Sequence, residues 1–205
     1  MEPVDKKKPA TYQDVLDAPE HMVAEIIDGE LHLSPRPGGP ATSVASFLAA
    51  DLINPFSRGR GGPGGWIILV EPELHLGDDI LVPDLAGWRQ ERMPVVPEAA
   101  YFEVAPDWIC EVLSRSTEKR DRLQKLRIYA RAGIQYAWLV HPRRRTLEAF
   151  KLQEGRWLSI ATLGDSDRAR IEPFDAIELD LGLLWANLPL PTRAGEESAE
   201  YSLTP

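Results

Sequence analysis

The sequence is poor in cysteine: Cys110 is the single one among 205 residues. A lone cysteine excludes an internal disulfide framework and a zinc site built from cysteines. Cys110 lies in the apolar segment Trp108-Ile109-Cys110-Glu111-Val112-Leu113, where a small buried hydrophobic side chain is its expected role. The thiol is therefore not a candidate nucleophile.

Long apolar stretches are also missing. The chain has no run of about 18 apolar residues, so no membrane-spanning helix is expected. The charged start, residues 1–8, is not followed by the apolar segment of a secretory signal. Together with the single cysteine, these absences lead us to expect a cytoplasmic protein.

A net positive charge is absent as well. The formal net charge is −9 at pH 7, which argues against general electrostatic attraction to nucleic acid. The charge is unevenly distributed, because residues 115–145 contain ten basic side chains and only two acidic ones. The sequence thus predicts one basic segment on an acidic body.

The length predicts one domain with a full hydrophobic core. Residues 1–10 contain lysine and proline and are expected to be disordered. Residues 11–189 carry the apolar patterns of the folded domain. Residues 190–205 form an acidic tail containing proline, which we expect to be loose.

Apolar periodicity and turn residues predict the elements of this domain. Helices are expected at residues 11–17, 41–56 and 118–132, the last ended by Gly133. Hairpins are expected around Asp28-Gly29 and Glu154-Gly155. Further strands are expected at 66–76, 80–88, 108–113 and 136–140, with a long loop at 90–106.

The order of these elements predicts an α/β fold. Short joins between successive strands require antiparallel pairing, whereas the strand–helix–strand unit at 108–140 permits a parallel pair. We therefore expect a mixed β-sheet flanked by helices, with an N-terminal and a C-terminal β-hairpin.

Two carboxylates, Asp84 and Glu111, interrupt apolar strands. A buried carboxylate is costly unless it is paired or bound to a cation. Two such acids on neighbouring strands form a hard-oxygen site for Mg²⁺ or Mn²⁺, and the ammonium of Lys125 can orient water or stabilise phosphoryl charge. An alternative stays open: each acid pairs with an arginine, and Lys125 bridges Asp121. Glu73 is a reserve ligand.

Six segments of the chain resemble a large bacterial family of putative restriction endonucleases, and Pro83-Asp84 with Glu111-Val112-Leu113 resembles the PD-(D/E)XK nuclease signature. The segments are Glu25-Ile26-Ile27-Asp28-Gly29-Glu30-Leu31, Val82-Pro83-Asp84, Glu111-Val112-Leu113-Ser114, Asp121-Arg122-Leu123-Gln124-Lys125, Tyr129-Ala130-Arg131-Ala132-Gly133 and Tyr136-Ala137-Trp138-Leu139-Val140. Their joint occurrence in this order makes the resemblance specific, and it extends over residues 12–185.

The resemblance implies a restriction-endonuclease-like core with a divalent-metal site. Asp84 and Glu111 would be the metal-binding acids. Leu113 occupies the usual lysine position of the Glu-X-Lys triplet, and Lys125 on the following helix matches the lysine that substitutes for it in this family. Glu25 matches the acid of the N-terminal hairpin and is expected to complete the catalytic group.

We therefore predict a metal-dependent nuclease that hydrolyses phosphodiester bonds in DNA. The basic residues that we expect to contact nucleic acid are Lys119, Arg120 and Arg122, although such residues also form solvated helix faces. RNA or branched DNA stays open as the substrate. So does a non-catalytic binding module that retains the nuclease-like fold. A homodimer is expected, since two sites could then cut two strands.

Overall fold

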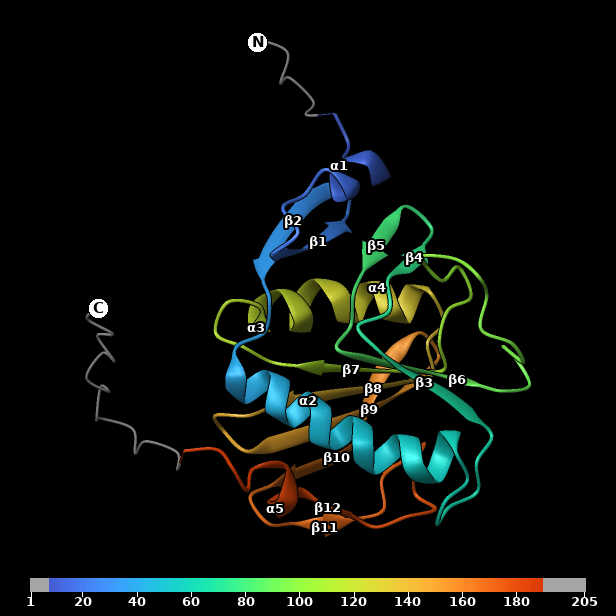
Figure 1. Ribbon diagram of the computed structural model, residues 1–205, viewed down its shortest axis with the longest axis vertical. Helices are drawn as coiled ribbons and strands as arrows, with labels where there is room; N and C mark the ends of the chain where they lie inside the picture. Colours follow the sequence, from blue (N-terminus) through green and yellow to red (C-terminus); the bar gives the residue numbers. More distant parts are fainter. Residues whose placement is uncertain (1–7, 190–205) are drawn as a thin grey trace.

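The computed structural model describes residues 8–189 of the chain. The segments predicted to be loose, 1–10 and 190–205, lie outside these residues except for Lys8, Pro9 and Ala10. A small four-stranded sheet contains the N-terminal hairpin, and a six-stranded sheet forms the body of the molecule (Figure 1). Within residues 8–189, no helix has the length and apolar character needed to span a bilayer.

The six-stranded sheet is mixed, as the sequence predicts. Its strands lie in the order β10-β9-β8-β7-β6-β3. They comprise β3 (Trp66–Val70), β6 (Leu85–Arg89), β7 (Trp108–Val112), β8 (Tyr136–His141), β9 (Thr146–Gln153) and β10 (Arg156–Gly164). Strands β7 and β8 are parallel because a helix connects them, and the other neighbouring strands are antiparallel.

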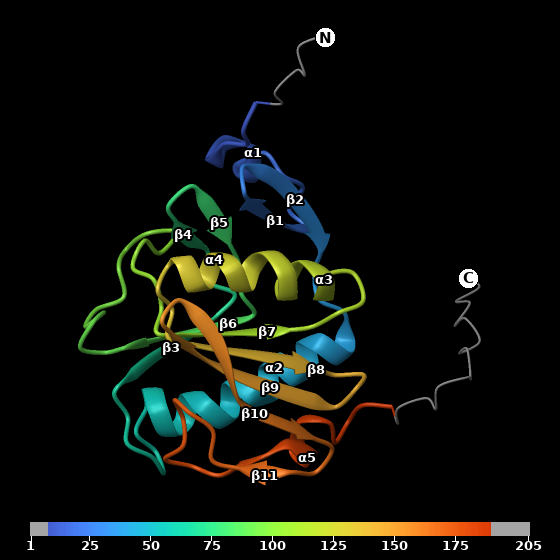
Figure 2. The ribbon, with the colours of Figure 1, turned by 180° about the vertical axis from the view of Figure 1, so that it is seen from behind.

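Helices cover both faces of this sheet (Figures 1 and 2). Helix α2 (Gly39–Leu52) lies on one face and continues into the π-helical turn η1 (Ile53–Ser57). The other face carries α3 (Glu118–Arg120), the π-helical turn η2 (Asp121–Lys125) and α4 (Leu126–Arg131) in direct succession. Gly133 follows this second helix with a φ of 76°, so its predicted role at the helix end is confirmed.

Alternation along β7 separates two hydrophobic cores. Trp108, Cys110 and Val112 belong to the core under α2, which also contains Val44 and Leu48. Ile109 and Leu113 belong to the core under α4, together with Ile128 and Tyr129. Because successive strand side chains point to opposite faces, Glu111 shares the α4 face with its neighbours at 109 and 113.

The N-terminal hairpin forms where it is predicted. Strands β1 (Met22–Ile27) and β2 (Glu30–Pro35) follow the short helix α1 (Tyr12–Leu16). Both turn residues have positive φ, 51° at Asp28 and 80° at Gly29, as a two-residue type I′ turn requires. The predicted C-terminal hairpin, β9–β10, turns in the same way at Glu154 and Gly155.

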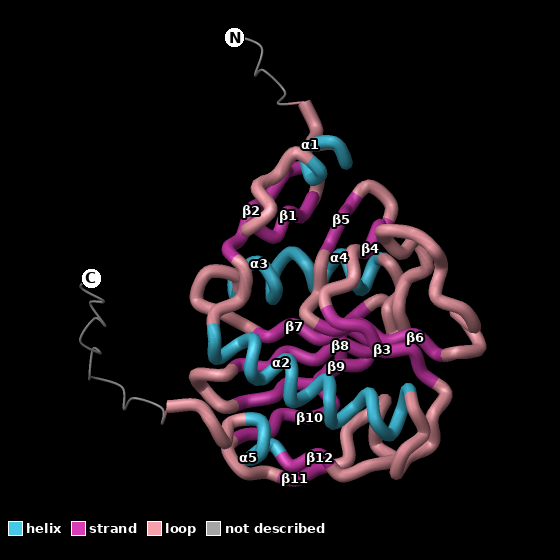
Figure 3. Tube along the Cα trace, in the orientation of Figure 1, coloured by secondary structure: helices cyan, strands magenta, loops and turns pink. Residues whose placement is uncertain are grey.

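The prediction of two long strands at 66–76 and 80–88 is wrong in one respect. Each is broken at a proline, Pro72 and Pro83, because proline cannot donate a hydrogen bond to a sheet ladder. The outer parts, β4 (Leu74–Leu76) and β5 (Asp79–Leu81), join the hairpin in a separate sheet of order β2-β1-β5-β4 (Figure 3). Asp84 consequently lies at the bend before β6 and not in the middle of a strand.

The C-terminal part of the described chain contains elements that the sequence patterns do not predict. Strands β11 (Arg168–Ala169) and β12 (Leu179–Asp180) form a two-stranded sheet, followed by helix α5 (Leu181–Leu184). Leu181 and Leu184 are fully buried in the α2 core. Elements of two to four residues are too short to show a periodic pattern.

Gly87 provides a test of the packing. A Cβ atom added there would lie 3.2 Å from Cε3 of Trp108 and 3.3 Å from Cε3 of Trp66, and both rings are buried. We expect Gly87→Ala to lower the free energy of unfolding by about 1–3 kcal/mol, as measured by urea denaturation. In the control Gly39→Ala, at the start of α2, the added Cβ meets nothing within 4 Å, so stability should not fall. Equal losses in both variants would contradict this packing.

Candidate active site

Asp84, at the bend before β6, lies opposite Glu111 on the neighbouring strand β7. In the antiparallel pair of β6 and β7, Leu85 is the partner of Cys110. Asp84, just before Leu85, therefore faces Glu111, just after Cys110. Both carboxylates line one pocket of about 70 Å³. The structure thus places the two acids in one pocket, and their roles in metal binding stay predictions.

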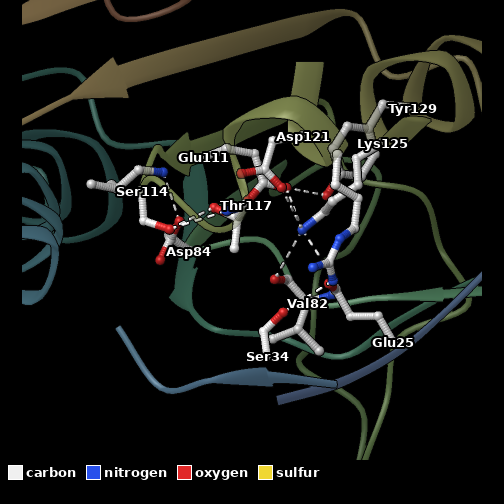
Figure 4. Close-up of polar contacts among 12 residues, drawn as sticks. Glu25, Ser34, Val82, Asp84, Glu111, Ser114, Thr117, Asp121, Lys125 and Tyr129 are labelled. Carbon is white, nitrogen blue, oxygen red and sulfur yellow. Dashed lines mark hydrogen bonds and ion pairs between the residues drawn. The ribbon is translucent and has the colours of Figure 1, made fainter. Parts of the chain in front are cut away.

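Lys125 reaches the same pocket from the helix on the α4 face. Its Nζ lies 2.8 Å from Oε1 of Glu111 and 2.8 Å from Oε1 of Glu25 (Figure 4). The Asp121 carboxylate is further away, at 3.9 Å. The lysine side chain is only 3% exposed, so the ammonium is held between two buried carboxylates. The bridge to Asp121 is thus the weakest of its three ion pairs.

Glu25 connects the small sheet to this group. Besides pairing with Lys125, its Oε1 accepts a hydrogen bond of 3.0 Å from the backbone N–H of Val82. Its Oε2 lies 3.7 Å from Nη1 of Arg120. Glu25 therefore fixes the position of the segment that leads into Asp84 relative to the helix that carries Lys125.

Each of the two facing acids has a further hydrogen-bond donor. The Tyr129 hydroxyl donates to Oε1 of Glu111 over 2.5 Å, and both groups are buried. The backbone N–H of Val112 donates to Oδ2 of Asp84 over 2.6 Å. These bonds fix one oxygen of each carboxylate, and Oδ1 of Asp84 has no hydrogen-bond partner among the described residues.

Burial changes the protonation of the group. It raises the pKa of Asp84 from 3.8 to about 6, although the Val112 N–H and the charge of Lys125 oppose the shift. Burial also raises the pKa of Glu111 well above its ordinary value. For Lys125, burial opposes the charge, but attraction to Glu111 and Glu25 outweighs it and raises the pKa well above its ordinary value. Lys125 thus keeps its proton at neutral pH.

The pocket contains more acidic than basic groups. Besides Glu71, which pairs with Arg36, four acids line it: Glu25, Asp84, Glu111 and Asp121. The cations that pair with them are Lys125 and Arg120. If all four acids ionise, two negative charges remain without a partner in a low-dielectric site. A divalent cation would supply the missing charge.

The oxygen donors of this pocket suit Mg²⁺ as a pair of carboxylates and not as a complete ligand shell. No group of three or more histidine, cysteine or acidic side chains within residues 8–189 is placed to hold a metal ion. Mg²⁺, however, commonly binds one or two carboxylates and completes its shell with water and phosphate oxygens. Asp84 and Glu111, lining the same pocket, provide such a pair.

The basic segment is largely neutralised by the acidic body. Arg122 forms ion pairs with Glu118 and Glu148, and Arg120 donates to Oγ of Ser34 over 3.0 Å. Arg127 and Arg131 pair with Asp28 and Asp79 of the small sheet. Of the three residues predicted to contact nucleic acid, Lys119 alone is exposed and makes no ion pair with another described residue.

Sequence reasoning missed Tyr129 as a functional candidate. It lies four residues after Lys125, so both side chains occupy the same helix face, and that spacing could have revealed it.

Glu71 also lines the pocket, whereas the reserve ligand Glu73 contacts His75, with 2.8 Å between Oε1 and Nε2. The two glutamates therefore point to different partners. Ala41 lines the pocket as well.

Comparison with known proteins identifies the family. The model of the Uma2 family, described as putative restriction endonuclease, matches residues 9–182. The chain belongs to this family. A crystal structure of a putative nuclease belonging to DUF820 from Anabaena variabilis ATCC 29413 shares the fold, with a TM-score of 0.67. The two sequences are 23% identical, and the match covers 87% of this chain and 98% of that one. No curated protein matches the chain.

The raised pKa of Asp84 predicts a pH-dependent stability in protein freed of metal with EDTA. The pKa of this carboxyl is 3.8 in the unfolded chain and about 6 in the folded protein. Between these two pH values, the folded state retains a proton that the unfolded chain has released. Its stabilising contribution is complete below about pH 4 and is lost as the pH rises through about 6, by up to about 3 kcal/mol.

Urea denaturation at about pH 5 and pH 7.5 measures this effect. Between these values, the wild type should lose more stability than Asp84→Asn, which has no titrating group at this position. Asp78→Asn, in the exposed turn between β4 and β5, should follow the wild type. An identical pH dependence in wild type and Asp84→Asn would contradict the assignment.

Proposed function

We propose that the protein is a divalent-metal-dependent nuclease that hydrolyses phosphodiester bonds in DNA, with Mg²⁺ or Mn²⁺ bound by Asp84 and Glu111. The observation that carries the proposal is the surplus of buried carboxylates around one ammonium. Membership of a family described as putative restriction endonucleases supports it. When bound, the metal would activate water and neutralise charge on the phosphate.

Lys125 supplies a fixed positive charge in this proposal. Because Glu111 and Glu25 keep its pKa high, it is an ammonium at neutral pH and cannot accept a proton as a general base. It can orient a water molecule by donating a hydrogen bond, or stabilise negative charge that develops on the phosphate. Leu113, in the usual lysine position, is buried on the same face as Glu111, so the helix delivers the charge instead.

Glu25 and Tyr129 act as positioning residues. Glu25 holds the ammonium of Lys125 and the Val82 backbone, and Tyr129 holds one oxygen of Glu111. A catalytic group must be placed within a fraction of an ångström to be effective. These two side chains thus support the geometry of the groups that act on the phosphate and the metal.

A non-catalytic binding module is the second candidate. Two observations favour it: Lys125 already pairs with Glu111 and Glu25, and most arginines of the basic segment are paired within the protein. Metal binding separates the two candidates, because only the nuclease requires it. A homodimer and a cytoplasmic location stay predictions, as does the choice of DNA over RNA.

Thermal unfolding tests the metal site. At a metal concentration about 100 times its Kd, binding to the folded state adds about 2.7 kcal/mol, so Mg²⁺ or Mn²⁺ should raise the Tm of the wild type by about 5–10 °C relative to EDTA. The shift should disappear in Glu111→Gln and persist in Glu98→Gln, a change in the exposed loop. No metal-dependent shift in the wild type would favour the binding module.

Lys125→Gln separates catalysis from metal binding. Loss of the ammonium should reduce metal-dependent DNA cleavage by at least about 100-fold, while the metal-induced Tm shift is retained or increased, because a competing cation has been removed from Glu111. Burial of two unpaired carboxylates should also lower stability by about 3–5 kcal/mol. If this variant does not fold, Lys125→Arg keeps the charge and should still show impaired cleavage. Cleavage at the wild-type rate in either folded variant would refute the role of Lys125.

A further inference from the structure

The pocket that contains Asp84 and Glu111 is too small for a nucleotide. Its volume of about 70 Å³ holds an ion with a few water molecules. Typical small-molecule sites occupy about 300–1,000 Å³. The nucleotides of a substrate must therefore be bound outside this pocket, with only the phosphate oxygens approaching it.

A second, larger hollow adjoins the pocket. We call it the α1 groove; it lies between helix α1, strand β1 and the bend at residues 71–73 and has a volume of about 430 Å³. It shares Val23, Glu71 and Val82 with the smaller pocket. The α1 groove therefore lies directly beside the pocket that holds the carboxylates, and it has the size of a single nucleotide.

One wall of the α1 groove is apolar. The apolar wall consists of Leu16, Pro19, Met22 and Val23. Leu16 is 59% exposed, and no other residue of its helix is buried either. Helix α1 thus presents an apolar side chain to solvent at the groove. The face of a nucleobase is apolar, and bases that leave the stack bind such surfaces in proteins.

Arg36 stands where the groove meets the pocket. It lines the α1 groove between Pro35 and Pro37, which line the pocket. Its side chain is 58% exposed, and its contacts are long: 3.4 Å from Nη1 to Oε2 of Glu71 and 3.4 Å from Nη2 to the carbonyl of Glu20. A guanidinium held this loosely is available to bind a phosphate, for which its planar donor pattern is suited.

The remaining polar groups limit what can enter. The α1 groove also contains three acids, Glu20, Glu73 and the Arg36 partner Glu71, and these carboxylates repel additional phosphates. They can accept hydrogen bonds from the amino groups of bases. One base with one phosphate next to Arg36 fits this distribution of charge, whereas the continuous double backbone of a duplex does not.

We propose that the α1 groove binds an unpaired nucleotide adjacent to the phosphate under attack, so that the substrates are single-stranded or branched DNA and not fully paired duplexes. This inference rests on the proposed nuclease function and adds the substrate class. A paired base is held in the helical stack and cannot enter a groove of this size without unpairing, which costs a few kcal/mol.

Binding of fluorescently labelled DNA to Asp84→Asn protein in Mg²⁺, followed by anisotropy, tests the proposal without cleavage. Three probes of equal length are compared: a single strand, a blunt duplex and a duplex with an unpaired flap. The single strand and the flap should bind more tightly than the blunt duplex. Leu16→Glu, added to this protein, should weaken binding of the first two probes about ten-fold and change binding of the duplex much less.

Two controls lie at the opposite end of the molecule, on α5 and β11 (Figure 1). Leu183→Glu alters a leucine of similar exposure, 61%, and should leave binding unchanged. Arg36→Gln should weaken single-strand binding and reduce the slope of log K against log salt by about 0.7, the value for one lost phosphate contact. The matched control Arg168→Gln replaces an arginine that is 65% exposed, and it should change neither single-strand binding nor the salt slope.

The outcomes distinguish the two proposals. Tighter binding of the blunt duplex, or unchanged single-strand binding in both Leu16→Glu and Arg36→Gln, would overturn the α1 groove as the nucleotide site while metal-dependent cleavage by the wild type persists. If no probe binds and the wild type shows neither a metal-induced Tm shift nor cleavage, both the groove and the nuclease function are refuted.

Discussion

The buried ammonium of Lys125 is the interaction on which the rest of the site depends. It lies between Glu111 of the large sheet and Glu25 of the small one, and it is carried by the helix that connects β7 to β8. Removing any one of the three would leave an uncompensated charge in the interior, which costs several kcal/mol. One ion-pair group therefore holds together three parts of the fold as well as the candidate catalytic residues.

The geometry of the sheet explains why the acids meet there. Side-chain alternation on β7 directs the tryptophan at 108 and its alternate neighbours to the α2 core, and it directs Glu111 to the opposite face. The break at Pro83 brings Asp84 to the same edge, opposite Glu111. The bend that interrupts the strand also separates the two sheets. The bend at Pro83 thus contributes to the site, and the bend at residues 71–73 borders the α1 groove beside it.

Much of the fold could be predicted because its signals are local. The hairpins at Asp28-Gly29 and Glu154-Gly155, the helix end at Gly133 and the strand containing Glu111 are all set by residues adjacent in sequence. The π-helical turn at 121–125 could not be predicted, since no residue there breaks an α-helix by itself. Nor could α5, whose four residues are ordered by packing on the α2 core.

For the site, the sequence by itself determined which side chains are chemically unusual: acids in apolar strands, and a lysine on the helix that follows. Only the tertiary structure decided what each of them contacts. It pairs Arg122, Arg127 and Arg131 with distant acids, so the basic segment is not the free cationic surface that its composition suggests. It also brings Tyr129 onto Glu111. Local patterns fix the elements, whereas contacts between residues far apart in sequence arise only when the elements pack, because burial of charge selects the partners.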